Sequence, residues 1–128
     1  MVAVTDGGDT TSRVDLREAL ETMHYADAIF YGILLRPITN DPGRNVGGEN
    51  ALALLAGGTG GKVYSATIGD QLDRVFTSIL DELRSQYFVA YSPVGVGGGS
   101  SRYHRVEVRV ARPELRVSTR SGYYESSR

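Results

Sequence analysis

The segment from Ala28 to Leu35 restricts the fold of this chain more than any other part of the sequence. Its residues form a continuous apolar run that is bounded by Asp27 and by Arg36-Pro37. A run this short suits a strand that is buried on both faces better than it suits a helix. Such strands belong to parallel sheets with helices on both sides. The segment therefore predicts the central strand of an α/β domain.

Other strands and helices are expected on both sides of this segment. Val2 to Val4 reads as a first buried strand, and Lys62 to Ala66 as a third. Asp15 with Glu18 three residues later fits a capping box, which predicts a helix start. The apolar stripe of that helix is Leu16, Ala19, Leu20 and Met23.

Two further helices complete the first part of the chain. The first is short, from about Glu49 to Ala56, and is expected to end at Gly57-Gly58. The second runs from Asp70 to about Ser85 and has a continuous apolar face at helical spacing, so it is expected to be mainly a core element. That face consists of Leu72, Val75, Phe76, Ile79, Leu80 and Leu83.

The C-terminal third has the pattern of antiparallel strands. Tyr87 to Tyr91, Val106 to Val110 and Leu115 to Thr119 read as strands, the last two with apolar and polar residues in alternation. We expect a hairpin or meander there, with the tail Gly122-Tyr123-Tyr124 packed back on the sheet. The predicted organisation is a three-layer α/β body with a partly parallel sheet over residues 1–92, and an antiparallel extension over 93–128.

A glycine-rich loop follows the first predicted strand. Asp6 stands at the carboxyl end of that strand, where ligands of open α/β sheets bind. Carboxylates there are candidate ligands for a divalent cation, so we take Asp6 and Asp9 as an incomplete metal site. The alternative is that both residues only shape a turn and cap the next helix. The candidate rim for a partner consists of Asp6, Gly7, Gly8, Asp9, Thr10 and Arg13.

Composition and motifs argue against several other classes of protein. The formal net charge of −1 gives no sign of the positive surface that nucleic-acid binding needs. The absence of cysteine excludes disulfides, and no apolar run is long enough to span a bilayer. The segment Gly57 to Lys62 leads into a strand and so does not suit a phosphate loop. His24 and His104 lack metal-ligand spacing, and no Gly-x-Ser-x-Gly elbow occurs. The tyrosines of the C-terminal third suit cross-strand packing, or a carbohydrate- or peptide-binding surface.

Several motifs, in order along nearly the whole chain, resemble a known family. The stretch from Thr5 to Thr10, TDGGDT, resembles the fourth-strand motif of von Willebrand factor A (VWA) domains. The closing segments are similar to the ending of a bacterial VWA-related family. Those segments read LRSQY from Leu83, YSP from Tyr91, YHRVEV from Tyr103 and RSGYY from Arg120.

The resemblance implies a three-layer α/β domain with a metal-ion-dependent adhesion site, and a partner protein that completes the coordination of Mg²⁺ or a similar cation. Of that site's residues, only the fourth-strand aspartate has a counterpart here, Asp6. The Asp-x-Ser-x-Ser motif is missing, so the chain is similar to the C-terminal half of such a domain plus its extension. We therefore expect weak binding of Mg²⁺ or Ca²⁺, or none. The resemblance also suggests an exported protein, although the pattern of the first residues given does not predict a signal peptide.

Three functions follow as hypotheses. The first is a non-catalytic VWA-like module that binds a protein through the rim. The second is a structural fragment, without a ligand of its own, that needs the missing half or self-associates through an exposed sheet edge and the apolar flank of Ala28–Leu35. The third and weakest is a phosphohydrolase-like enzyme. No partner nucleic acid and no membrane insertion are expected.

Overall fold

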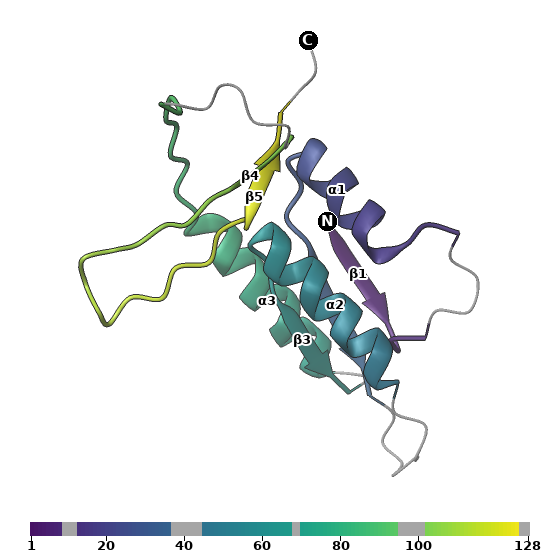
Figure 1. The fold of residues 1–128 in the computed structure, drawn as a ribbon. Helices are drawn as coiled ribbons and strands as arrows, with labels where there is room; N and C mark the ends of the chain where they lie inside the picture. Colours follow the sequence, from purple (N-terminus) through teal and green to yellow (C-terminus); the bar gives the residue numbers. More distant parts are fainter. Residues whose placement is uncertain (9–12, 37–44, 68–69, 95–101, 126–128) are drawn as a thin grey trace.

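The computed structural model describes residues 1–8, 13–36, 45–67, 70–94 and 102–125. It is a mixed α/β structure with two sheets (Figure 1). The first part alternates strands and helices as the sequence predicts, and the C-terminal part adds two short strands. The elements are β1 (Val2–Thr5), α1 (Leu16–Tyr25), β2 (Tyr31–Leu35), α2 (Val46–Thr59), β3 (Val63–Ala66), α3 (Asp70–Arg84), β4 (Tyr103–Arg105) and β5 (Gly122–Tyr124).

The larger sheet is parallel and has the order β1-β2-β3. The apolar run at Ala28–Leu35 supplies β2, which pairs on both sides, so its prediction as the central strand is confirmed. In the register, Ile33 stands beside Val4 on β1 and beside Tyr64 on β3. The predicted exposed flank at Ala28–Leu35 is wrong, because β2 has a neighbour on each edge and Ile33 is fully buried.

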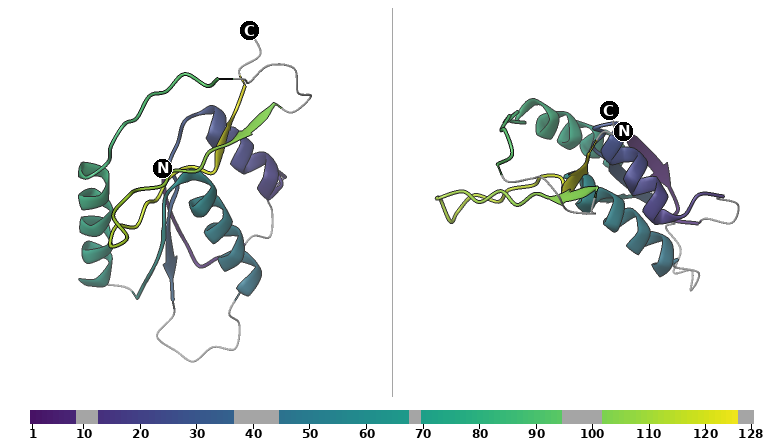
Figure 2. Two further views of the ribbon diagram at one scale, coloured as in Figure 1. Left: turned by 60° about the vertical axis from the view of Figure 1, so that its left-hand side comes forward. Right: turned by 45° about the horizontal axis from the view of Figure 1, so that its top comes forward.

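Helices lie on both faces of this sheet, which gives three layers (Figure 2). Tyr31 and Ile33 point to the face covered by α3, where they form the main core with Ala66, Val75 and Ile79. The other face is covered by α1 and α2, which also pack against each other. The alternation along β2 therefore places one apolar set under each layer of helices.

The N-terminus of α1 follows the predicted cap. Asp15 is the N-cap residue, and its Oδ1 accepts a hydrogen bond from the backbone N–H of Glu18 at 2.8 Å. By contrast, α2 starts earlier and ends later than predicted. It begins after Asn45 and includes Gly57 and Gly58, and its C-cap is Gly60 in the left-handed conformation (φ 84°). The helix therefore ends at Thr59, three residues after the predicted Ala56, and Gly60 provides the αL cap.

The prediction for α3 is right in extent but wrong in burial. Val75 and Ile79 are buried against the sheet, whereas Phe76, Leu80 and Leu83 are each about half exposed. The reason is the position of the helix. Its Glu82 contacts side chains of β3, so the helix sits at that side of the sheet and its other flank faces solvent.

The C-terminal part contains less strand than the sequence predicts. β4 and β5 pair antiparallel, which confirms a C-terminal antiparallel arrangement. The predicted strands at Tyr87–Tyr91, Val106–Val110 and Leu115–Thr119 are wrong, because these residues form no ladder. Alternation of apolar and polar residues indicates a strand with one wet face, but a strand also needs a neighbour, and most side chains there are exposed.

The smaller sheet is attached to the first by the end of α2. The backbone carbonyl of Gly58 accepts hydrogen bonds from His24 Nε2 (2.8 Å) and from the N–H of Ser121 (2.9 Å). Thr59 and Arg120 form an isolated antiparallel bridge. The Gly122–Tyr124 tail was predicted to pack back on the sheet; in the structure it forms β5, which pairs with β4 in the smaller sheet and contacts α1.

One polar network fixes α3 to β3. Glu82 accepts hydrogen bonds from the Lys62 ammonium and, at 2.7 Å, from the Tyr64 hydroxyl. Burial and the hydrogen bond to Glu82 raise the pKa of Tyr64 to about 12. Partial burial favours the neutral form of Glu82, but the hydrogen bonds from Lys62 and Tyr64 hold the pKa of Glu82 below its ordinary value.

This network predicts how stability changes at alkaline pH. Because the fold favours the protonated phenol of Tyr64, its contribution is present below pH 10 and is lost as the pH rises toward about 12. Urea unfolding across this range is expected to show a smaller alkaline loss for Tyr64→Phe than for the unmodified protein. The control is Tyr87→Phe, which removes an exposed hydroxyl outside the network. Equal alkaline losses in the unmodified protein and Tyr64→Phe would contradict the expectation.

Candidate functional site

The Asp6 loop lies at the carboxyl end of β1. The strand ends at Thr5, and the chain turns at Gly7, whose φ of 86° lies in the left-handed region that favours glycine. The Thr5 side-chain oxygen accepts a hydrogen bond from the Gly7 N–H at 3.0 Å. The turn is therefore set by residues that the sequence singles out, at the edge of the sheet where ligands of such folds bind.

The carboxylate of Asp6 is exposed and shapes this turn. Its Oδ1 accepts a hydrogen bond from the backbone N–H of Gly8 at 2.9 Å, which is the geometry of an Asx turn. This is the structural role that the sequence left open as the alternative to cation binding. The bond occupies one lone pair of Oδ1, and a carboxylate has further acceptor sites, so the turn and a ligand contact at this exposed side chain are compatible.

The N-terminus of α2 lies directly beside the loop. An added Cβ at Gly7 would be 3.7 Å from the Glu49 nitrogen, and one at Gly48 would be 1.6 Å from the Gly7 oxygen. Asn45 caps the helix by accepting from the Gly48 N–H at 2.9 Å. The backbones of the loop and the helix are thus in contact, and only glycine fits at Gly48.

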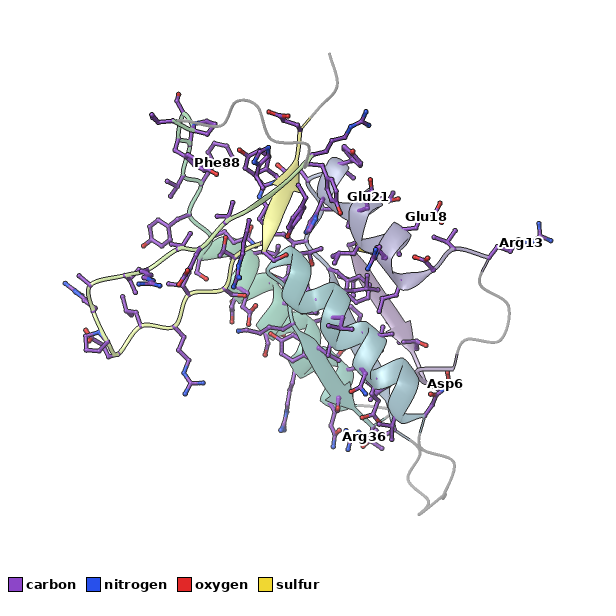
Figure 3. All side chains as sticks on the ribbon, viewed as in Figure 1. Asp6, Arg13, Glu18, Glu21, Arg36 and Phe88 are labelled. Carbon is purple, nitrogen blue, oxygen red and sulfur yellow. The ribbon has the colours of Figure 1, made fainter. Side chains whose placement is uncertain are left out.

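A basic residue joins this edge from β2. Arg36 follows the end of β2, and its guanidinium lies 4.0 Å from the Glu49 carboxylate in the first turn of α2. Figure 3 shows Asp6 and Arg36 at the same end of the molecule. Among the described residues, no group of three or more acidic, histidine or cysteine side chains could hold a metal ion. The described edge therefore carries Asp6, the Arg36–Glu49 pair and the capped start of α2.

The predicted rim is only partly brought together. Asp6, Gly7 and Gly8 are adjacent, whereas Figure 3 shows Arg13 well apart from Asp6. Asp9 and Thr10 lie outside the described residues. Sequence reasoning missed Asn45 and placed the helix start at Glu49. An asparagine three residues before Gly48 is the signal that could have found it, because asparagine is a favoured N-cap residue.

A second surface lies on the same strand, and we call it the open flank. It consists of the outer edge of β1 and the apolar side chains of Val2, Val4, Phe76, Leu80 and Leu83. By register, Val2 and Val4 stand on the same face as Tyr31 and Ile33, yet Val4 is 50% exposed. Because Glu82 ties the opposite side of α3 to β3, the exposed row of α3 faces toward β1. In the part of the chain that the structure describes, no strand pairs with the outer edge of β1.

Comparisons with models of known protein families, with curated proteins and with solved structures return no match. Among the described helices, none combines the length and the apolar character needed to cross a bilayer. The site is therefore characterised by its own geometry, which is an exposed carboxylate in a turn at the end of an edge strand, next to an apolar surface.

Proposed function

We propose that this chain is a non-catalytic protein-interaction module, VWA-like in its α/β core, that binds a polypeptide along the open flank. The observation that carries the proposal is the exposure of Val2 and Val4 on β1. Their register partners on β2, Tyr31 and Ile33, lie on the same face of the sheet and are buried. Parallel sheets occur almost only with both faces covered, and exposed apolar patches on soluble proteins mark interaction surfaces.

The flank fits one kind of occupant. A strand added to the outer edge of β1 satisfies its backbone groups, and a helix connected to that strand covers Val2, Val4 and the exposed row of α3. Each of the five apolar side chains is about half exposed, so covering it contributes about 1 kcal/mol before the cost of ordering. The partner is thus a strand–helix segment, supplied by another polypeptide or by a second copy of the chain.

Asp6 has a place in the same proposal. It ends β1, so the carboxyl end of an added parallel strand reaches the same edge of the sheet. A loop from the partner then brings further oxygen ligands to Asp6, and Mg²⁺ or Ca²⁺ would bind there in the complex. Alone, one carboxylate in an Asx turn is a poor site for Mg²⁺, which needs near-octahedral coordination.

A displayed library of strand–helix segments tests the proposal. Each member carries a short β-branched strand followed by an amphipathic helix. Selected binders are expected to protect the amides of Val2–Thr5 from hydrogen exchange, and to bind Leu80→Glu about tenfold or more weakly. The matched control is Leu54→Glu, an exposed leucine on α2, which lies on the opposite face of the sheet. Binding that Leu80→Glu leaves unchanged would overturn the proposal.

Two further measurements separate the alternatives. Sedimentation velocity of the unmodified chain identifies a second copy as the occupant if the chain forms dimers that Leu80→Glu dissociates. Calorimetry of the free chain with Mg²⁺ or Ca²⁺ is expected to show weak binding or none. Micromolar binding that Asp6→Ala abolishes would show a complete site in the free chain and contradict the partial site proposed here.

A further inference from the structure

A pocket of about 400 Å³ opens where α1 ends, far from the Asp6 loop. Its walls come from three parts of the chain: the end of α1, the exposed segment that follows α3, and β5 with the residues before it. This volume falls within the range of small-molecule sites. Its lining includes Tyr25, Asp27, Tyr91, Arg120, Tyr123 and Tyr124.

The backbone at Asp27 is the first sign that the pocket has a role. The helix ends in a Schellman arrangement: Asp27 N–H bonds to the His24 carbonyl (3.3 Å) and Ala28 N–H to the Met23 carbonyl (3.0 Å). Asp27 takes the left-handed position (φ 52°), which usually holds glycine. Strain of this kind clusters at functional sites, because the side chain there is needed for something else.

The Asp27 carboxylate is directed at Arg120. Its Oδ1 lies 2.5 Å from a terminal guanidinium nitrogen of Arg120. Arg120 is held in place by its bridge to Thr59, and by the hydrogen bond from the N–H of Ser121 to the Gly58 carbonyl. Both ends of the pair are therefore anchored in the backbone, while the charged groups themselves stay open to solvent.

Tyrosine rings form the rest of the wall. Tyr124 stacks on Tyr25 with ring centroids 5.2 Å apart. Burial and the neighbouring Tyr91 phenol raise the pKa of Tyr123. Its hydroxyl, like that of any tyrosine at neutral pH, can donate and accept hydrogen bonds. The pocket thus combines aromatic rings with hydroxyls that both donate and accept.

The charges of the pocket decide the class of ligand. A cationic ligand would meet Arg120, and an anionic ligand would meet Asp27, whereas the pair together is neutral. A carboxylate acceptor beside a guanidinium donor matches two neighbouring hydroxyl groups, each of which can donate and accept. The aromatic rings match the apolar face of a ring that carries such hydroxyls.

We propose that this pocket binds a sugar ring, with the Asp27–Arg120 pair on adjacent hydroxyls and the tyrosine rings, Tyr91 among them, against the sugar's C–H face. The site is separate from the open flank and does not depend on the function proposed for it. A proline-rich peptide also favours aromatic grooves, but it offers hydrogen-bond acceptors without matching donors, and so leaves the carboxylate of the pair unused.

The test uses nuclear magnetic resonance titration of the full chain with methyl glycosides of glucose, galactose, mannose and N-acetylglucosamine. At least one glycoside is expected to shift the amide signals around Asp27 and Arg120 in a saturable way. Tyr91→Ala is expected to weaken binding about tenfold. The matched control is Tyr87→Ala, a tyrosine in the same exposed segment that does not line the pocket.

A second variant separates binding from folding. Asp27→Gly gives the backbone the residue that suits its conformation, so its melting temperature is expected to be unchanged or higher while glycoside binding is lost. The absence of shifts with every glycoside at high millimolar concentration would overturn the proposal. So would glycoside binding that Asp27→Gly leaves intact, or binding of a hexaproline peptide in place of the glycosides.

Discussion

Replacing Gly48 with alanine is expected to lower the free energy of unfolding by about 3 kcal/mol or more. A Cβ at this position would lie 1.6 Å from the Gly7 oxygen and 2.6 Å from the Gly7 carbonyl carbon. Both atoms belong to the backbone of the Asp6 loop, so no rotamer change can relieve the overlap. The start of α2 must move away from the loop, and the hydrogen bond to Asn45 is strained with it.

The same helix provides the control for this experiment. An added Cβ at Gly57 meets no atom within 4 Å, and Gly57 lies in the helix interior. Gly57→Ala is therefore expected to stabilise the protein by about 0.5–1 kcal/mol, because alanine has the better helix propensity. Urea unfolding followed by circular dichroism measures both variants. A Gly48→Ala variant as stable as the unmodified protein would show that α2 does not contact the loop.

Truncation of Ile33 to alanine is expected to cost about 3–5 kcal/mol. Ile33 is fully buried between the central strand and α3, so the change removes its contacts and leaves a cavity in the main core. A domain of this size has a total stability of only about 5–15 kcal/mol, so the variant is expected to be at the limit of folding. Urea unfolding by circular dichroism and the loss of near-ultraviolet signal measure the effect.

Val4 is the matched comparison for Ile33. The two residues are partners in the register and share one face of the sheet, but Val4 is half exposed. Val4→Ala is therefore expected to cost no more than about 1 kcal/mol in the isolated chain. The same variant is expected to weaken an occupant of the open flank, because the removed atoms then lie in an interface. A cost at Val4 equal to that at Ile33 would show that the flank is already covered.

The elements of the first part of the chain were predictable because local rules and packing agree there. The apolar run at Ala28–Leu35 has the length and flanks of a central strand, and Asp15 has the spacing of a cap that the structure realises. The start of α2 was missed because Gly47 and Gly48 have poor helix propensity. A glycine is needed at position 48 because the backbone there contacts Gly7, which is distant in the sequence.

The candidate site was predictable only where its geometry depends on residues that are adjacent in the sequence. The Asp6–Gly8 turn follows from residue type, whereas the approach of Arg36 and Glu49 depends on how the strands and α2 meet. The open flank could not be foreseen from the pattern of α3, since all six apolar residues read as one buried face. The lateral position of the helix, fixed by Glu82, decides which of them the sheet covers. The sequence did not indicate the left-handed conformation of Asp27, because glycine is the residue that usually predicts it and none stands at this position.

The shared hydrogen bonding at Gly58 has a consequence for proteolysis. Its carbonyl joins α1, through His24, to the segment before β5, through Ser121, and Ser118 also bonds to the Gly60 carbonyl. The chain between α3 and β4 contributes none of these bonds, and Tyr87 and Phe88 are almost fully exposed. A protease that cuts at these residues would therefore yield two fragments that stay assembled. The C-terminal fragment would remain hydrogen-bonded to the end of α2 and packed on α1.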